Sequence, residues 1–531
     1  MSATVAPELT PTTLPAIPDV RHRVERLTPL LLTFGVFLAA VMSITPWPVG
    51  AYEDDAIYTL LAKSLATGEG YRMINLPGAP HATHYPPGYP LFLSLLWRIW
   101  PAFPDNVVVF KFANAVLLAA AAGGVYWFAR RRLDCGVATS SVIAILGIAS
   151  LPMLQLAGLV LSEPAFVALL FLSVPFVERS AKTGHARDAA VAGALLGALT
   201  MVRSIGIVAI GASVLVLLLR RHLRAAFTVA GAAALFLVPW QLWVSAHQAE
   251  LPSILTGKYG PYGPWLADGY RSGGLDFARS VVMQNLASIG NTLSYFVMPA
   301  PLWWARLVAL VILAGLLAAG IAVLARRSAF LALFLPLYLA LIIAWPFDPY
   351  RFLLPLWPVV VITAGAAVYA LSCWRPADVT RRGLRWFALG GVACLVAGHL
   401  AYNWIGLRGR SWTDLQMRAG VSARPLLEWV MRNTNEGDVL STEHDVLVYL
   451  YTGRRGVPTS TFLPSQRVRP FSPADNMQWV GTMVRTFEPR FLVTGWPPHI
   501  AAADSLTTGT SPLLHRVGSI PNHTIFERVS R

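Results

Sequence analysis

The sequence predicts a polytopic α-helical membrane protein of about eleven transmembrane helices, followed by a soluble α/β domain. Three observations predict this class. Of 531 residues, 55% are hydrophobic and only 13% are charged, whereas soluble domains carry about a quarter charged residues. Long apolar runs recur from residue 28 to residue 405, and from residue 406 onward the composition becomes that of an ordinary soluble domain.

A helix needs about 20 apolar residues to cross a bilayer. Between 189 and 219 an apolar stretch too long for one span is interrupted at Arg203, which predicts two short helices that meet there. The nine other expected spans are runs at about 28–47, 106–129, 137–157, 159–177, 226–244, 307–325, 329–347, 352–374 and 386–405.

The two ends of the chain differ from this central part. Residues 1–27 begin with a Pro-, Thr- and Ala-rich stretch and no signal-peptide pattern, so we expect a disordered cytoplasmic tail. The segment 406–531 is expected to be an α/β unit. Its elements are helices at 422–433, 444–452 and 475–486, strands at 438–442 and 490–495, and a pair of strands in 514–529.

Basic residues indicate the orientation. The formal net charge is +15, but the arginines and lysines form short clusters at alternate connections between the apolar runs and no basic patch, which argues against a nucleic-acid partner. By the positive-inside rule these connections face the cytoplasm. The N-terminus is then cytoplasmic in an inner (plasma) membrane, and loops 48–105 and 245–302 lie outside with the C-terminal domain.

Five charged residues stand out because they lie on the outer side near the membrane: Asp54, Asp55, Glu163, Arg203 and Arg351. The two arginines also break the positive-inside pattern. An ion buried there without a partner is costly. Carboxylates at a water-accessible mouth could act as a general base or hold a divalent cation such as Mg²⁺ or Mn²⁺, with Asp54 and Glu163 as ligands. Arginines at the same depth could bind a phosphate. Together these residues predict a site for a lipid phosphate.

Each of these residues also has a structural interpretation. The aspartates could cap the helix that follows them, and Glu163 could be a carboxylate favoured at a helix start. The two arginines could anchor the protein at the headgroups.

The first outer loop contains two further signals. Residues 55–70 have the apolar spacing of a helix that lies in the membrane interface, and a Pro-Pro turn at 86–87 precedes a second such helix. His81 and His84 lie between them. They could ligate a metal, although no third ligand has a telling spacing, and His84 could instead contact a phosphate or an acceptor.

Several strings in the chain resemble one known family. EDDAIYTLLAKSLATGEGY and HYPPGYPLFLSLLWRIWP resemble the first-loop motifs of GT-C glycosyltransferases, which use polyprenyl-phosphate sugars. They are most similar to the branch of protein O-mannosyltransferases and lipid A aminoarabinose transferases. LSEPAFVALLFL resembles the second-loop carboxylate motif of that family, LTMVRSIGIVAI its arginine hairpin and PYRFLLPLWP its late Arg-aromatic motif. The resemblance covers about residues 28–372, and the motifs follow the family's order.

The resemblance implies roles. Asp54 matches the general base of an inverting displacement and Asp55 its supporting neighbour, while Glu163 matches a carboxylate that positions acceptor or cation. Arg203 and Arg351 match residues near the donor phosphate. The remaining candidate substrate-binding residues are Tyr58, His84, Tyr85 and Lys258. Tyr85 stands where aminoarabinose transferases carry a lysine, which weakens an assignment to that substrate.

The function we expect is therefore transfer of a sugar from a polyprenyl phosphate to a hydroxyl of a glycan, lipid or protein on the outer face. The segment 256–270 could close over the site or be a passive linker. A flippase of lipid-linked sugars is one alternative, although a transporter would usually show internal repeats. A non-catalytic scaffold with an outer binding domain is another.

Overall fold

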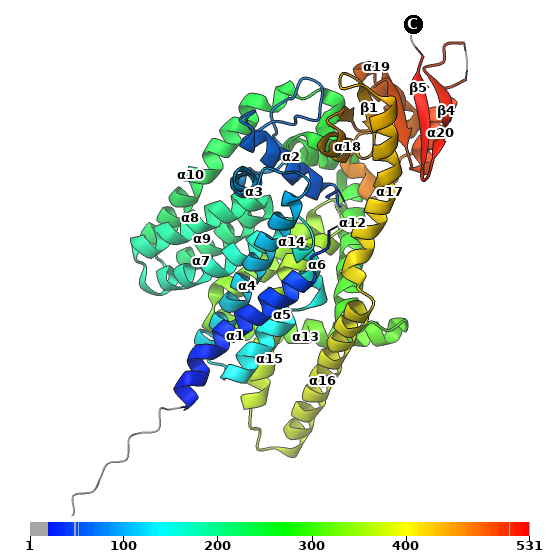
Figure 1. The fold of residues 1–531 in the computed structure, drawn as a ribbon. Coiled ribbons are helices and arrows are strands. Elements are labelled where there is room, and N and C mark those ends of the chain that lie inside the picture. The colour runs from blue at the N-terminus through cyan, green and yellow to red at the C-terminus, as the bar shows by residue number, and fades with distance from the viewer. Residues whose placement is uncertain (1–19, 47–48, 51, 509, 530–531) are drawn as a thin grey trace, which may run out of the picture.

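The computed structural model describes residues 20–46, 49–50, 52–508 and 510–529. Most of the expected N-terminal tail, residues 1–19, lies outside the described part of the chain, and the first helix begins at Val20. The described residues form a long helical bundle with a small sheet domain at one end (Figure 1).

All eleven apolar runs form helices. They are α1 (Val20–Met42), α4 (Asn106–Arg131), α5 with α6 (Val137–Ile148, Leu151–Ala157), α7 (Glu163–Thr183), α8 (Ala186–Val202), α9 (Ile207–Leu219), α10 (Leu223–His247), α13 (Trp303–Arg327), α14 (Ala329–Ala344), α15 (Tyr350–Cys373) and α16 (Val379–Arg408).

Fewer of these helices are long enough to cross a membrane than the sequence suggested. In the described part of the chain, seven are long and apolar enough, or eight if α5 and α6, which meet at 59°, form one bent span. The three others are α8, α9 and α14. They have 17, 13 and 16 residues, fewer than the roughly 20 that a full crossing needs. The protein is thus a multi-pass membrane protein with seven or eight candidate spans.

The two large loops carry helices of their own. The first loop forms α2 (Asp54–Ala66) and α3 (Gly88–Ile99), where two interfacial helices were expected. The second loop is more helical than expected. A short α11 (Thr256–Tyr259) precedes α12 (Tyr262–Val297), which is kinked at Gly274, where a positive φ of 59° interrupts the helix. The segment 256–270 is therefore mostly helical.

The C-terminal domain contains a five-stranded mixed sheet of order β2-β1-β3-β5-β4. Strands β1 (Val439–Thr442), β2 (Arg455–Val457) and β3 (Phe491–Thr494) are parallel, while β5 (His523–Arg528) runs antiparallel to both β3 and β4 (Leu514–Ile520). The register pairs Leu440 with Phe491 and Leu492 with Phe526.

Four helices surround this sheet: α17 (Ser411–Asn433), α18 (Asp445–Thr452), α19 (Pro473–Phe487) and α20 (Pro497–Ser505). The elements expected in the tail are all present, and the expected helix at 422–433 is the second half of α17. Strand β2 and helix α20 were not expected. Three residues of β2 are too few to show an alternating pattern, and α20 begins with two prolines, which by themselves indicate a turn.

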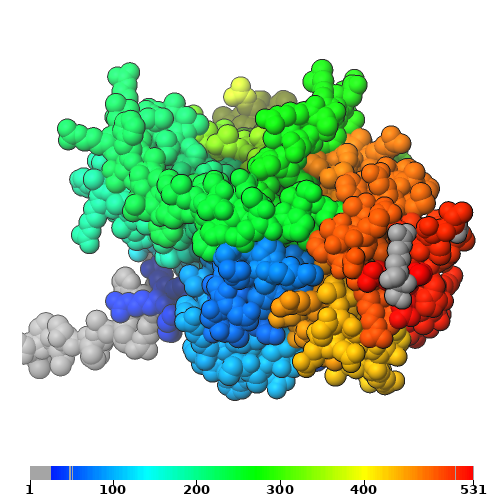
Figure 2. Space-filling view, turned by 90° about the horizontal axis from the view of Figure 1, so that it is seen from above, coloured from blue at the N-terminus to red at the C-terminus, as the bar shows by residue number. Residues whose placement is uncertain are grey.

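The C-terminal domain packs directly on the helical part. Val446, Leu450 and Val457 belong to the same hydrophobic core as the membrane helices. Helices α2, α3 and α18 lie at the same end of the molecule, while the start of α1 and the α15–α16 connection lie at the other (Figure 1). Seen from above, the first loop in blue meets the second loop in green and the domain in yellow to red (Figure 2).

Candidate functional site

Four of the expected charged residues meet because each stands at the end of a helix. Asp54 and Glu163 begin α2 and α7, Arg203 follows the last residue of α8, and Arg351 is the second residue of α15. Arg351 donates from Nη1 to Asp54 Oδ2 at 2.5 Å and from Nε to Glu163 Oε1 at 2.8 Å. Arg203 Nη1 lies 2.8 Å from the same Glu163 oxygen. The chain thus builds one compact cluster of two carboxylates and two guanidinium groups.

Solvent exposure distinguishes the two carboxylates. The side chain of Glu163 is 0% exposed, whereas that of Asp54 is 25% exposed. Because Glu163 is enclosed and contacts both arginines, it is suited to hold them in place. Asp54 is the carboxylate of this pair that remains accessible from outside the protein.

Two tyrosines of the first loop complete the cluster. Tyr85 donates its hydroxyl to Asp54 Oδ1 at 2.6 Å. The hydroxyl of Tyr58 lies 3.1 Å from Ser162 Oγ, which also accepts from Arg203 Nη1 at 3.1 Å. Each oxygen of Asp54 therefore has one donor that stabilises its ionised form.

The charge state of Asp54 follows from these contacts. Burial opposes ionisation, but Arg351, the Tyr85 hydroxyl and Arg203 outweigh it and hold the pKa of Asp54 below its ordinary value of 3.8. At neutral pH Asp54 is therefore an anion able to accept a proton.

Asp55 has a different environment from Asp54. It is buried, and its carboxylate accepts hydrogen bonds from the backbone amides of Gly50 at 2.9 Å and Tyr52 at 3.2 Å. These bonds fix the chain just before α2. Asp55 therefore supports Asp54 by holding the segment that leads into the helix.

His84 lies beside the cluster and contacts the second loop. Its Nδ1 donates to the carbonyl oxygen of Gly260 at 2.6 Å, and its ring packs between those of Tyr85 and Tyr262, with centroids 4.5 and 4.1 Å away. Burial lowers the pKa of His84, although the Gly260 bond and the nearby Asp54 oppose this. His84 is therefore neutral at pH 7 and joins the first loop to the second.

Lys258 lies in a separate cluster at the same mouth. Its Nζ is 2.6 Å from Glu53 Oε1 and 3.4 Å from Asp445 Oδ1. Asp445 belongs to the C-terminal domain and Glu53 directly precedes Asp54. Lys258 thus connects the second loop to the C-terminal domain and to the residue before Asp54.

Three atoms of the main cluster have no partner. Among the described residues, Glu163 Oε2, Arg203 Nε and Arg351 Nη2 are buried and make no hydrogen bond within the protein. Buried polar atoms are nearly always satisfied, and exceptions often have a functional reason. A phosphate is a ligand that would satisfy the two guanidinium atoms.

The expected metal position between Asp54 and Glu163 does not fit this arrangement. The guanidinium of Arg351 binds both carboxylates and therefore occupies the place of a divalent cation. A different group could hold a metal ion. His81, His247 and Glu250 offer ligand atoms within 4.8 Å of one another. The two partners of His81 are thus the last residue of α10 and a residue of the turn that follows it, and the expected partner His84 is not in this group.

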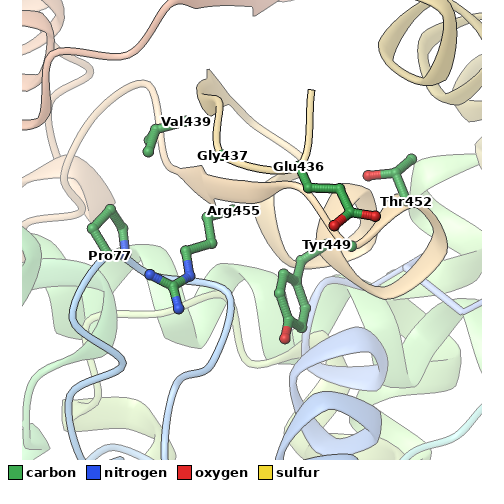
Figure 3. Close-up of a pocket in the computed structure, with 8 residues that line it drawn as sticks. Pro77, Glu436, Gly437, Val439, Tyr449, Thr452 and Arg455 are labelled. Atoms are coloured by element: carbon green, nitrogen blue, oxygen red, sulfur yellow. The ribbon is translucent and has the colours of Figure 1, made fainter. Parts of the chain in front are cut away.

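A pocket of about 470 Å³ lies elsewhere, between Pro77 of the first loop and residues 436–439 and 449–455 of the C-terminal domain. Figure 3 shows Glu436, Tyr449 and Arg455 along its domain side. No residue of the main cluster lines it. It is an opening between the loop and the domain and not the centre at Asp54.

Sequence reasoning missed some residues of these clusters. Ser162 and Glu53 stand next to Glu163 and Asp54 inside the motifs already singled out, so neighbourhood alone could have suggested them. Asp445 carries no such signal, because only the folded chain brings it to the second loop.

Comparison with known proteins identifies the fold. No protein-family model and no curated protein matches the chain. Among solved structures, the crystal structure of ArnT from Cupriavidus metallidurans bound to undecaprenyl phosphate is similar, with a TM-score of 0.57 and 15% identity over 94% of this chain and 98% of that one. Its apo form gives a TM-score of 0.54 and 13% identity over 94% and 97%. The chain therefore has an ArnT-like fold.

Proposed function

We propose that this protein is a membrane glycosyltransferase that moves a sugar from a polyprenyl phosphate to an acceptor hydroxyl. The observation that carries the proposal is the cluster of Asp54 and Glu163 with Arg203 and Arg351 at one mouth. The ArnT-like fold supports it, because the ArnT structure of the same fold holds undecaprenyl phosphate.

In the proposed reaction Asp54 is the general base. The acceptor oxygen forms a bond to the anomeric carbon while the bond from that carbon to the phosphate oxygen breaks. The acceptor proton passes to Asp54, and the polyprenyl phosphate leaves with the electron pair. A single displacement of this kind inverts the anomeric centre.

Arg203 and Arg351 stabilise the leaving phosphate. Charge develops on the phosphate oxygen in the transition state, and donors that are already in place stabilise it without reorganisation. Their unpartnered atoms, Arg203 Nε and Arg351 Nη2, are the donors available for this contact. Glu163 keeps both guanidinium groups at the correct depth.

The other contacts to substrate come from the two loops. Tyr85 orients Asp54, and Tyr58 positions Ser162 beside Arg203. His84 lies at the junction with the second loop, where it contacts the entering sugar or its phosphate. Lys258, held between Glu53 and Asp445, supports this junction from beside the site. The same loop carries segment 256–270, which we propose covers the site during transfer.

We also propose that a divalent cation is bound by His81, His247 and Glu250, since two imidazoles and a carboxylate are zinc ligands. It would brace the first loop against α10 and takes no part in the displacement. Metal analysis of the purified protein should find about one equivalent, lost in the double variant His81→Ala/His247→Ala. Equal metal content in both proteins would contradict this assignment.

The proposed orientation places the site and the C-terminal domain outside the cytoplasm. The rival flippase would move lipid-linked sugars across the membrane without consuming them. Its charges would be expected near the bilayer midplane, whereas here they stand at helix ends beside the sheet domain.

A panel of polyprenyl-phosphate sugars tests the proposal directly. The purified protein in lipid nanodiscs should release free polyprenyl phosphate from one member when acceptor extract from the cell envelope is added. A deletion strain should accumulate that same lipid. If no lipid in the panel is consumed and none accumulates, the proposal is wrong.

A further inference from the structure

The C-terminal domain inserts one buried carboxylate into the junction of both outer loops. Asp445 is 1% exposed. It accepts from Asn75 Nδ2 of the first loop at 3.0 Å and from the Tyr259 hydroxyl of the second loop at 2.7 Å. Lys258 Nζ is 3.4 Å away. A single residue of α18 thus contacts three side chains that lie outside its own domain.

Lys258 links Asp445 to Glu53, the residue directly before Asp54. Its ammonium lies between Asp445 and Glu53, 2.6 Å from Glu53 Oε1. Glu53 has a positive φ of 63°, which residues other than glycine rarely adopt, and its carbonyl oxygen accepts from Ile57 N at 3.0 Å. The conformation of Glu53 therefore sets the direction of the first turn of α2, where Asp54 stands.

The relay formed by Asp445, Lys258 and Glu53 places one ammonium between two carboxylates. Burial would lower the pKa of Lys258, but Glu53 and Asp445 outweigh it and raise that pKa above its ordinary value. One ammonium serves two carboxylates, so removing either carboxylate changes how Lys258 is held. An unpaired buried charge is strongly unfavourable, which keeps Lys258 and Asp445 together.

Packing supports the same connection on both sides of Glu53. A Cβ added at Gly50 would lie 2.3 Å from Leu447 Cδ1 of α18, so the chain before α2 lies tightly against this helix. On the other side, Gly456 N donates to Asn75 O at 2.9 Å. The first loop therefore rests on the C-terminal domain at two points.

We infer that Asp445 is a positioning residue for the transfer reaction: through Lys258 and Glu53 it fixes the first turn of α2 and so holds Asp54 against Arg351. The C-terminal domain is thereby part of the catalytic unit. The inference rests on the proposed function for its effect on activity, but its structural part can be measured without any substrate.

Hydrogen exchange tests the structural part. Asp445→Asn removes the charge that holds Lys258 and nearly keeps the shape of the side chain. Glu443→Gln is the matched control, because Glu443 lies two residues away and bonds to His499 at 2.8 Å within the domain. Peptides covering 49–60 and 253–262 should exchange faster in Asp445→Asn and at the wild-type rate in Glu443→Gln. Wild-type exchange in both variants would overturn the inference.

Kinetics test the functional part in full-length protein. We expect kcat to fall roughly 10- to 100-fold in Asp445→Asn, with little change in KM for the lipid donor. The acid limb of kcat/KM should move to higher pH, because Asp54 is then less well paired with Arg351. Lys258→Met should give a similar loss, and the double variant should be no worse than the poorer single one. If the kcat losses of the two single variants multiply in the double variant, the residues act independently and the relay is contradicted. A change in KM for the lipid donor without a change in kcat would contradict it as well.

The two hypotheses fail in different ways. If the wild-type protein consumes no polyprenyl-phosphate sugar, the proposed function is wrong and the exchange experiment still decides the role of Asp445. If transfer occurs but Asp445→Asn reacts like Glu443→Gln, the positioning role is wrong and the proposed function stands. Should Asp445→Asn not fold, Lys258→Met breaks the same relay from the second loop and decides the outcome.

Discussion

Asp54 and Glu163 carry the same functional group in different environments. Glu163 is enclosed and contacts two arginines, whereas Asp54 is partly exposed and contacts one arginine and one phenol. This difference is the reason for proposing Asp54 as the base and Glu163 as the residue that holds the arginines. At the residue scale, exposure and partners decide function more than residue type.

Removing the Tyr85 hydroxyl should change the pH dependence of the reaction. In Tyr85→Phe, Asp54 loses a donor that lowers its pKa, so the pKa rises and the acid limb of kcat/KM moves to higher pH, with a loss of roughly tenfold or less near neutrality. Tyr71→Phe is the control, since its hydroxyl bonds to the backbone of Tyr85. An unmoved acid limb in Tyr85→Phe would contradict the pairing.

The same pKa shift also affects stability. Because the folded pKa of Asp54 is below 3.8, its ion pair stabilises the fold at pH values above the unfolded pKa. This stabilisation is lost as the pH falls through the folded pKa.

The sequence predicted the four charged residues of the main cluster but not their neighbours. Asp54, Glu163, Arg203 and Arg351 could be found because charge near a membrane is costly and breaks an otherwise regular pattern. Asp445 could not, since a carboxylate in a soluble domain is ordinary until the fold buries it beside another segment.

Helix α11 joins the second loop to the C-terminal domain, as does α12. A Cβ added at Gly257 would lie 2.3 Å from Phe462 O and 2.4 Å from Thr461 Oγ1. The helix can approach the domain this closely only with glycine there. Lys258 and Tyr259, which contact Asp445, depend on that approach.

Gly257→Ala should therefore displace α11 and lower the transfer rate by roughly tenfold or more. Gly263→Ala in the adjoining α12 is a matched control, because a Cβ there meets nothing within 4 Å. We expect it to react like the wild type. Wild-type rates for Gly257→Ala would show that the position of α11 does not matter.

Element boundaries show why only seven or eight of the eleven expected spans have the length and composition of a full crossing. Hydrophobic runs predict that a segment is buried, and α8, α9 and α14 are indeed apolar helices, yet they have at most 17 residues. The second loop was underestimated for the opposite reason, because its glycines and prolines suggested irregular chain.

At the scale of the whole molecule, the C-terminal domain and the helical part form one packed body. Val446, Leu450 and Val457 share a hydrophobic core with the membrane helices. The sequence predicted the elements of the domain from their periodicity. It could not predict this packing, because an apolar face does not indicate which surface covers it.

Cysteine labelling tests the proposed orientation of the molecule. Cys373 is exposed at the end of α15, on the side proposed to face the cytoplasm. In a Cys394→Ser background, a membrane-impermeant maleimide should leave Cys373 unlabelled in intact cells and label a cysteine introduced by Ser505→Cys in α20. Labelling of Cys373 but not of the introduced cysteine would reverse the orientation.

The most direct test of the central claim compares binding and transfer in Asp54→Asn. The variant keeps the shape of the side chain but cannot accept the acceptor proton, so we expect transfer to fall by about 10²- to 10⁴-fold, while the dissociation constant for the lipid donor stays near the wild-type value. Transfer at the wild-type rate would show that Asp54 is not the base and would contradict the account.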